Sequence, residues 1–341
     1  MKKLLVCLLS MAFVLAMGGM ALAAVSGPCV NCHTMHNSQA GDDVNAAGPF
    51  GALVNNTCLG CHTTSGSDPL STTGFPYVKS TTGGFTDQYC LAGGFFPSGT
   101  DGTDNLGKAH SLGSTTAPPG YNLTWYQGAS APGLSCAGTR GCHGSQTVAD
   151  EMGAVKGGHH SPTVYRILWN YNGGAPVGIT GVGASDYEEA LNLNTTAPTG
   201  SYTRSDATYA HNVYIAGTSN DTISKLCANC HGDFHGTGTG SGSPWQRHPT
   251  DVELPISWDA RGDAISSDVD CKYNPFGFVS GATDTTGAKY ATCLSCHRAH
   301  GTASYDILRF GYNTALGDAS TGQSAGSGNM YGCLGCHSKQ R

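Results

Sequence analysis

Five pairs of cysteines in the sequence share the spacing C-x-x-C-H, in which a histidine directly follows the second cysteine. The pairs are Cys29 and Cys32, Cys58 and Cys61, Cys227 and Cys230, Cys293 and Cys296, and Cys333 and Cys336, followed by His33, His62, His231, His297 and His337. This spacing is typical of haem c attachment, because two thiols reach the two vinyl groups of one porphyrin while the next imidazole binds the iron. A zinc site would not require a histidine after every second cysteine, and a thioredoxin-like site would need one motif beside a βαβ pattern. The five motifs therefore predict five haem c groups.

A sixth segment keeps the Cys-His end of the motif but has a longer loop. In Cys136-Ala-Gly-Thr-Arg-Gly-Cys142-His143, five residues separate the two cysteines. We expect a sixth haem site with an enlarged loop, because Cys-His-Gly after upstream glycines is similar to the other attachment sites. The cysteine count leaves two alternatives open: five haems leave Cys90, Cys136, Cys142 and Cys271 for two disulfides, and six leave Cys90 and Cys271 for one.

The chain has more histidines than attachment requires. If all six sites bind haem, six of the 14 histidines are proximal iron ligands, and eight remain: His36, His110, His159, His160, His211, His235, His248 and His300. Such an excess, in a chain with only 12% charged residues, predicts that most of them are second axial ligands of bis-histidine irons. The pattern does not choose among His159, His160 and His211.

Three of these histidines follow a proximal histidine at helical spacing. His36 follows His33 by three residues, His300 follows His297 by three, and His235 follows His231 by four. Residues at these separations lie on one helix face, so both imidazoles would approach from the same side and cannot be trans ligands of one iron. Each second histidine must therefore serve a different haem. The result is a stacked chain of irons without an open position, which suits electron transfer and not enzymatic catalysis.

The elements that must position these ligands have little regular structure in the sequence. Segments such as Ser98-Gly-Thr-Asp-Gly102 and Gly236-Thr-Gly-Thr-Gly-Ser-Gly242 are typical of the stretches between motifs, and few runs have helical periodicity. The motifs also lie at irregular intervals, which excludes a simple solenoid repeat. We expect a multihaem cytochrome c, mostly loops with short helices and few strands wrapped around a stacked haem chain. Short strands are expected near 164–169 and 213–215.

The start of the chain has the pattern of a secretory signal. Lys2 and Lys3 precede an apolar run from Leu4 to Met20, and Ala21-Leu22-Ala23 provides a small-residue cleavage site. We expect residues 1–23 to be a signal peptide and residues 24–341 to form a single multihaem cytochrome c domain. The protein would be secreted to the extracellular space or cell surface, with the periplasm as the alternative. No second apolar stretch of about 18 residues follows, which predicts no membrane span.

The charge balance argues against one class of partner. The 341 residues include 23 Asp plus Glu against 17 Lys plus Arg, a net charge of −6. Nucleic-acid affinity depends mainly on basic side chains that contact phosphates, so we expect no nucleic-acid partner.

The motifs and their flanking residues resemble those of the outer-surface multihaem c-type cytochromes of metal-reducing bacteria. The resemblance rests on Cys29-Val-Asn-Cys-His-Thr-Met-His-Asn-Ser38, Cys227-Ala-Asn-Cys-His231, Arg247-His-Pro249, Cys293-Leu-Ser-Cys-His-Arg-Ala-His300 and the last motif near the C-terminus. It covers the ligand-bearing segments from end to end, and it is strongest to the hexahaem type that forms extracellular cytochrome nanowires.

This resemblance implies bis-histidine haems in alternating parallel and T-shaped pairs and long-range extracellular electron transfer. It implies that the chain polymerises head to tail with copies of itself, with His36 ligating the iron held by Cys293, Cys296 and His297 of the next subunit. It further implies other distal ligands: His110, His235, His248 and His300. Expected partners are other multihaem cytochromes and extracellular electron acceptors such as metal oxides.

Two features depart from the filament-forming type. The filament-forming type has an ordinary C-x-x-C-H at the third site, whereas this chain has the Cys136–Cys142 loop. The loop is followed by Gly157-Gly-His-His160, which is similar to a segment of related cytochromes that do not form filaments.

Two other functions remain open: a monomeric periplasmic or secreted electron shuttle and a multihaem oxyanion reductase. A reductase would need one iron with an open position.

Overall fold

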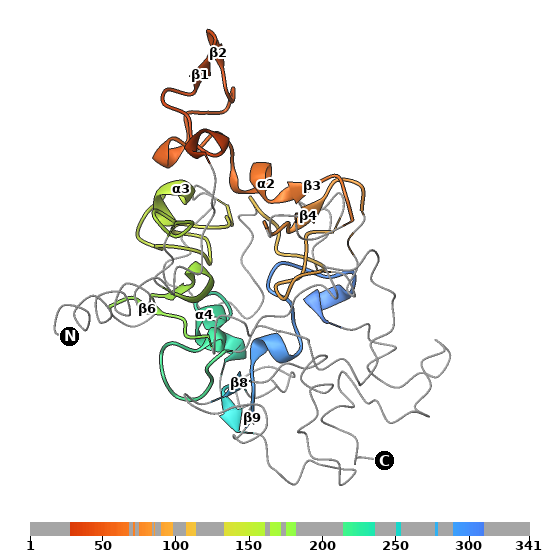
Figure 1. Ribbon diagram of the computed structural model, residues 1–341. Helices are drawn as coiled ribbons and strands as arrows, with labels where there is room; N and C mark the ends of the chain where they lie inside the picture. Colours follow the sequence, from red (N-terminus) through yellow and green to blue (C-terminus); the bar gives the residue numbers. More distant parts are fainter. Residues whose placement is uncertain are drawn as a thin grey trace, which may run out of the picture.

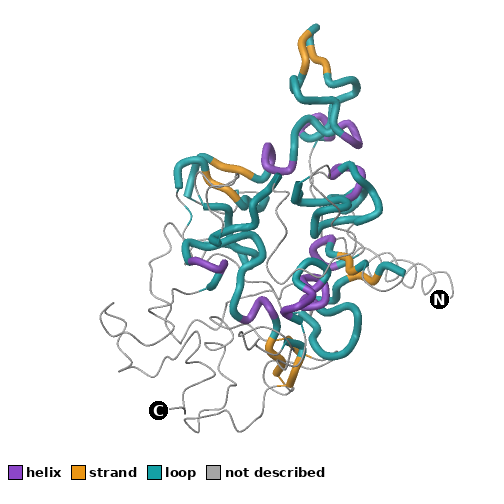
Figure 2. The backbone as a smooth tube through the Cα atoms, turned by 180° about the vertical axis from the view of Figure 1, so that it is seen from behind, coloured by secondary structure: helices purple, strands orange, loops and turns teal. Residues whose placement is uncertain are grey.

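The computed structural model describes residues 28–67, 71, 75–83, 85, 90–97, 107–113, 133–160, 164–171, 175–181, 214–235, 250–253, 277–278 and 289–309. Loops and turns make up most of this part of the chain (Figure 2). The predicted architecture of loops, short helices and few strands is therefore confirmed. Several predicted features lie outside the described residues: the signal peptide, the last C-x-x-C-H motif with Cys333, Cys336 and His337, and the residues His211, His248 and Cys271.

The described helices are single turns or little more. The α-helices are α2 (Cys58–Cys61), α3 (Glu151–Ala154) and α4 (Ile223–Ala228), and the 3₁₀-helices are η1 (Cys29–Asn31), η2 (Gly51–Leu53), η4 (Tyr165–Ile167), η5 (Gly232–Phe234), η7 (Cys293–Ser295) and η8 (Tyr305–Ile307). Side chains of Thr57, Asp150 and Thr222 accept hydrogen bonds from the first turns of the three α-helices, as N-cap residues do. In the part of the chain that the structure describes, no helix has the length and apolar character needed to cross a bilayer.

The described strands form four small sheets. β1 (Ser38–Gln39) pairs antiparallel with β2 (Asp42–Asp43), β3 (Thr63–Thr64) pairs parallel with β4 (Lys79–Ser80), β5 (Trp169–Asn170) pairs antiparallel with β6 (Val177–Gly178), and β9 (Lys289–Ala291) lies between β7 (Val252–Glu253) and β8 (Gly277–Phe278). The β1–β2 hairpin projects from one end of the described chain, and β8 and β9 lie at the opposite end (Figure 1).

One turn occurs three times and was not predicted. The supporting turns, as we call residues 51–54, 165–168 and 305–308, each contain η2, η4 or η8 and a left-handed second residue, with φ of 54° at Ala52, 53° at Arg166 and 56° at Asp306. In each case the last residue of the turn forms an antiparallel bridge with a proximal histidine: His33 with Val54, His143 with Leu168, and His297 with Leu308.

The supporting turns also explain why the strand expected near 164–169 is wrong. Arg166 and Ile167 have positive φ values, which an extended strand does not allow, and only Trp169–Asn170 is a strand. Of the expected strand at 213–215, Tyr214 forms an isolated bridge with Gly181.

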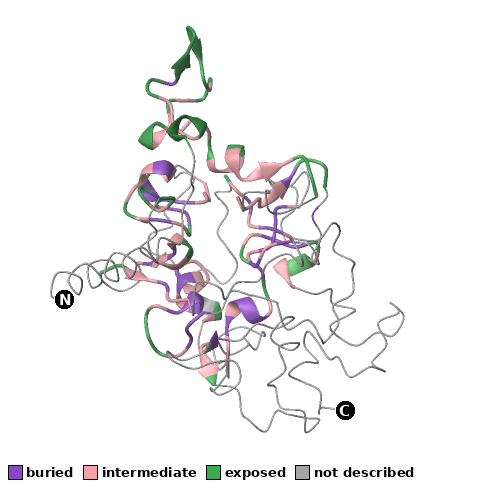
Figure 3. Cartoon of the chain, in the orientation of Figure 1, coloured by how far each residue is buried: buried purple, intermediate pink, exposed green. Residues whose placement is uncertain are grey.

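Short buried stretches are scattered along the described chain (Figure 3), and their side chains form small separate clusters. The clusters among the described residues include Leu168, Ile179, Tyr214, Ile223, Leu226 and Leu294; Phe85, Cys90 and Phe95; and Ala137, Ala154 and Val155. The hairpin strands β1 and β2 are exposed throughout. Clusters of this size leave the attachment motifs to be held mainly by backbone hydrogen bonds.

Candidate haem-binding sites

Backbone hydrogen bonds close each described C-x-x-C-H segment into one turn. We number the attachment motifs in chain order as sites 1 to 6, whose first cysteines are Cys29, Cys58, Cys136, Cys227, Cys293 and Cys333. At sites 1, 2, 4 and 5, the histidine amide donates to the carbonyl of the first cysteine, at 2.8, 2.8, 2.9 and 3.0 Å. At sites 1, 4 and 5 the second cysteine donates to the same carbonyl, at 3.1, 3.1 and 3.3 Å. Each turn therefore carries two thiols and one imidazole as a unit.

Four proximal histidines face a histidine from another part of the chain. The ring centroids are separated by 6.0 Å for His33 and His160, 6.2 Å for His62 and His159, 6.2 Å for His143 and His300, and 6.2 Å for His231 and His110. Two imidazoles bound trans to one metal by bonds of about 2 Å hold their centroids about 6 Å apart. The ring separations of the four pairs therefore match those of two ligands of one iron.

Hydrogen bonds to backbone carbonyls orient four of these imidazoles and that of His297. The Nδ1 atoms bond to carbonyl oxygens at His33 (Ala52, 3.0 Å), His62 (Pro76, 2.8 Å), His110 (Ala299, 2.6 Å), His143 (Arg166, 2.9 Å) and His297 (Asp306, 2.7 Å). Because a carbonyl only accepts, Nδ1 carries the proton in each case and Nε2 keeps its lone pair for a metal. Three of the five acceptors are the left-handed residues of the supporting turns.

The sequence reasoning missed these acceptors, although two of the turns have a visible pattern. Tyr165-Arg-Ile-Leu168 and Tyr305-Asp-Ile-Leu308 share three of four residues. The repetition of this tetrapeptide after two attachment motifs was the available signal.

Burial favours the neutral form of the imidazoles. Desolvation lowers the pKa of His62, His110, His143, His297 and His300, and the pKa of His300 falls to about 3. These side chains are therefore neutral at pH 7, and the neutral imidazole is the form that binds iron.

Two predicted distal ligands lie apart from the four pairs. His36 is exposed and belongs to none of the four pairs. The Nε2 atom of His235 lies 3.1 Å from Oδ2 of Asp251, a buried carboxylate oxygen that also accepts a 2.6 Å hydrogen bond from the Thr222 hydroxyl. His248 lies outside the described residues, as does the sixth motif.

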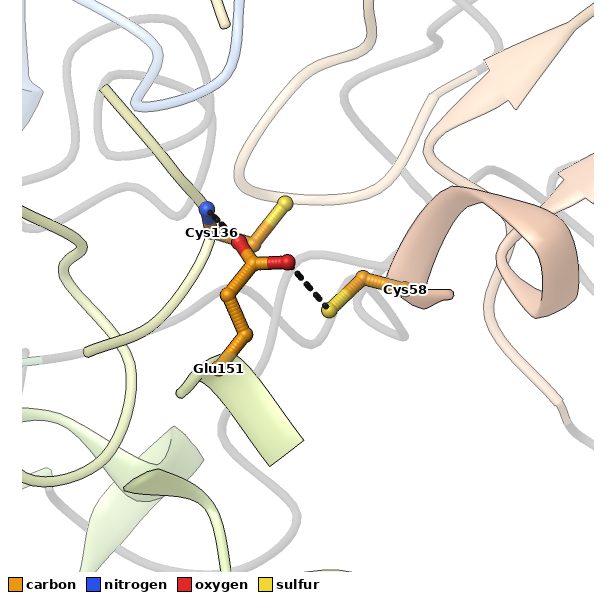
Figure 4. A group of neighbouring side chains, drawn as sticks. All are labelled: Cys58, Cys136 and Glu151. Carbon is orange, nitrogen blue, oxygen red and sulfur yellow. Dashed lines mark hydrogen bonds between the residues drawn. The ribbon is translucent and has the colours of Figure 1, made fainter. Parts of the chain in front are cut away.

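Thiols of successive sites meet directly at two places. Cys58, Cys136 and Glu151 have ligand atoms within 4.8 Å of one another, and Glu151 lies between the two cysteines (Figure 4). The Glu151 carboxylate accepts a 2.8 Å hydrogen bond from the amide of Cys136 through Oε1. Its Oε2 accepts a longer hydrogen bond, of 3.9 Å, from Sγ of Cys58. A hydrogen bond between the two thiols raises the pKa of Cys58 and lowers that of Cys136. A second such thiol pair joins Cys227 and Cys293, with the pKa of Cys227 raised and that of Cys293 lowered.

Comparison with known proteins relates this chain to a c-type cytochrome. No family model matches the sequence. C-type cytochrome OmcS of Geobacter sulfurreducens is 27% identical over 368 aligned positions, which cover 96% of this chain and 78% of OmcS. The cryo-EM structure of OmcS nanowires is 20% identical with a TM-score of 0.43, and a second OmcS filament structure is 19% identical with a TM-score of 0.41; each covers 84% of both chains. The resemblance predicted from the motifs is confirmed: over nearly its whole length, this chain is similar to a c-type cytochrome of nanowires.

Proposed function

We propose that this protein is an extracellular electron-transfer protein that holds five or six c-type haems between histidine pairs and polymerises head to tail. Similarity to a C-type cytochrome over 96% of the chain supports the haem c chemistry. OmcS is the protein of solved nanowires and filaments, which supports a filament here. The haems supply the redox chemistry, and the residues of this chain attach, orient and order them.

The four histidine pairs are the observation that carries this proposal. In each pair one ring comes from an attachment motif, and the other, His110, His159, His160 or His300, comes from elsewhere in the chain. An iron bound on both sides has no position for a substrate, which argues for electron transfer and against a reductase. Both His159 and His160 would be ligands, of sites 2 and 1 respectively.

The neighbours of the attachment cysteines support an arrangement in which the sites follow one another in space as they do in sequence. The electrostatic or hydrogen-bonded neighbours are Cys32 with Cys61, Cys58 with Cys136, Cys142 with Cys230, and Cys227 with Cys293. These neighbours join sites 1 to 2, 2 to 3, 3 to 4 and 4 to 5. The two hydrogen-bonded pairs, which join first cysteines, lie at the second and fourth of these junctions.

An internal symmetry supports His36 as a ligand for another subunit. Sites 1, 3 and 5 share the supporting turn, and sites 1 and 5 each have a histidine three residues after the proximal one. At site 5 this histidine, His300, lies opposite His143 of site 3, two sites earlier in the chain. If His36 has the same relation to its partner, its iron belongs to a site two places before site 1. The same chain has no site before site 1, so a neighbouring subunit would supply it.

Site 5 is the matching acceptor for His36. The proximal His297 has its Nδ1 bonded to Asp306, yet it belongs to none of the four histidine pairs among the described residues. His36 is exposed and lies two residues before β1 of the projecting hairpin (Figure 1), next to Met35, whose exposed fraction is 79%. An exposed apolar side chain beside an exposed ligand suits burial against a second copy of the chain.

A head-to-tail contact of this kind is heterologous, and it extends as a filament when the rotation does not close. We infer that the filament lies outside the cell and passes electrons to other multihaem cytochromes or to acceptors such as metal oxides. The expected secretion signal supports this location.

The test is to replace His36 with Ala and, as a matched control, to replace Gln39, an exposed residue of the same hairpin, with Ala. Protein purified from the extracellular fraction is imaged by cryo-electron microscopy, and haem per chain is measured from the pyridine haemochrome spectrum. We expect His36→Ala to keep its haem count but form no filaments, and Gln39→Ala to form them normally. Intact filaments in the His36→Ala variant would overturn the proposed linkage, and native monomers with His36 bound internally would establish a shuttle.

A further inference from the structure

We propose that the Cys136–His143 segment covalently binds a haem c through its five-residue loop, so that the chain carries six haems. This inference rests on the proposed haem function of the C-x-x-C-H sites and extends it to a segment without that spacing. Four sets of contacts support it: the closure of the loop, the packing of the extra residues, the orientation of His143 and the position of Cys136.

The first support is that the long loop closes as the short ones do. The amide of Cys142 donates to the carbonyl of Cys136 at 3.2 Å, and the amide of His143 donates to the same carbonyl at 3.0 Å. These are the same two hydrogen bonds that close sites 1, 4 and 5, with almost the same lengths. The first cysteine, the second cysteine and the histidine therefore have the same backbone connection as in a C-x-x-C-H turn.

The second support is that the extra residues fold away from this closure. Gly138 has a φ of 86°, and its carbonyl accepts from Gly141 at 3.0 Å. A Cβ on Gly141 would lie 2.3 Å from backbone atoms of Ala137, so glycine is required for this close approach. The amide of Thr139 donates to the carbonyl of Val148 at 3.1 Å, which fixes the loop to the following segment.

The third support is the orientation of His143. Its Nδ1 bonds to the carbonyl of Arg166 in a supporting turn, as His33 and His297 bond to theirs at two C-x-x-C-H sites. Its ring lies 6.2 Å from that of His300, the same separation as in the other pairs. His143 therefore shares both its hydrogen bond and its ring separation with histidines of ordinary C-x-x-C-H sites.

The fourth support is the position of Cys136 beside Cys58. The Sγ atoms of Cys58 and Cys136 lie within 4.8 Å of each other, and the thiols of Cys227 and Cys293, which both belong to C-x-x-C-H motifs, form a similar hydrogen-bonded pair. Cys136 therefore occupies the place of a first attachment cysteine at an even-to-odd junction. The alternative uses of the Cys58, Cys136 and Glu151 group, as a metal site or a disulfide, would take Cys58 from its own motif.

The attachment chemistry needs no external oxidant or reductant. At each cysteine the thiol S–H adds across one vinyl group, so that a C–S bond forms while the S–H bond and the vinyl π bond break. The hydrogen moves to the terminal vinyl carbon. Both Cys136 and Cys142 must be reduced thiols when this occurs, which excludes a disulfide between them.

Arg140 makes a direct test possible in the native protein, because it lies between the two cysteines. Trypsin cleaves after Arg140 and so separates peptide 109–140, which contains Cys136, from peptide 141–156, which contains Cys142 and His143. We expect the two peptides to remain joined after disulfide reduction, as one species with the mass of both plus one haem and with Soret absorption. Separate peptides with alkylated cysteines would overturn the proposal. Haem on the C-x-x-C-H peptides of the same digest shows that the proposed function holds regardless, and its absence there would refute both.

Two variants provide a second, independent count. Cys136→Ser with Cys142→Ser should lower the haem content by one per chain. Deletion of residues 138–140 leaves Cys-Ala-Gly-Cys-His, an ordinary attachment motif, and should keep the native count. A native count in the double serine variant would refute the proposal, as would a gain of one haem in the deletion variant.

Discussion

Replacing His159 and His160 one at a time tests whether two adjacent residues serve two different irons. The ring of His160 lies 6.0 Å from that of His33, and the ring of His159 lies 6.2 Å from that of His62. Each alanine variant removes one imidazole and leaves one proximal histidine without a partner, so it opens one coordination position per chain. In a six-haem chain, each single variant should therefore expose about one iron in six, and the double variant about one in three.

The assay is a carbon monoxide titration of the reduced protein, followed by the difference spectrum and expressed as carbon monoxide bound per chain. The native protein should bind none, and each single variant should bind one equivalent. Lys156→Ala, at an exposed position near the pair, is the matched control and should match the native protein. The pairing is refuted if only one single variant binds carbon monoxide, or if the double variant binds no more than a single one.

Two further predictions follow from the backbone and the buried imidazoles. Arg166 has a φ of 53°, a conformation that only glycine adopts without strain. Relative to Arg166→Ala, the Arg166→Gly variant should therefore have a free energy of unfolding higher by about 1 kcal/mol. The free energy of unfolding of Arg166→Val should be lower than that of Arg166→Ala. Guanidinium unfolding followed by circular dichroism checks the order, and a valine variant as stable as the glycine variant would contradict it. Burial lowers the pKa below 6.5 for five imidazoles: His62, His110, His143, His297 and His300. Below pH 6.5 the unfolded chain therefore binds more protons than the folded chain. Stability should therefore be complete above pH 6.5 and fall below it, by at most about 1.4 kcal/mol per pH unit for each imidazole; an unfolding midpoint at pH 5.5 equal to that at pH 7.5 would refute this.

The attachment motifs were predictable because their geometry is local. Two cysteines and a histidine within five residues form one turn, closed by hydrogen bonds to the carbonyl of the first cysteine. The general architecture also followed, because glycine-rich polar segments without periodicity do not support long helices or strands. The argument that His300 serves a haem other than that of His297 agrees with its place opposite His143.

The histidine pairs were not predictable, because they depend on tertiary structure. The second ring of each pair comes from a segment roughly a hundred residues or more from the histidine of the attachment motif, and no local pattern encodes such a distance. The sequence therefore left open which of His159 and His160 binds, whereas the structure sets each opposite a different proximal histidine. The strand expected near 164–169 failed for a related reason: its apolar side chains suit a strand, but the left-handed Arg166 turns its carbonyl to His143.

The supporting turns have a consequence for how this chain can diverge. The histidine and its carbonyl partner are 19 residues apart at site 1, 23 at site 3 and 9 at site 5, yet the same bridge forms each time. Insertions and deletions between a motif and its turn therefore need not move the imidazole. Selection can preserve the order and contacts of the motifs while most of the remaining sequence drifts in length and composition. A relative at 27% identity can then share the arrangement of attachment motifs and histidines while sharing little of the polypeptide that surrounds it.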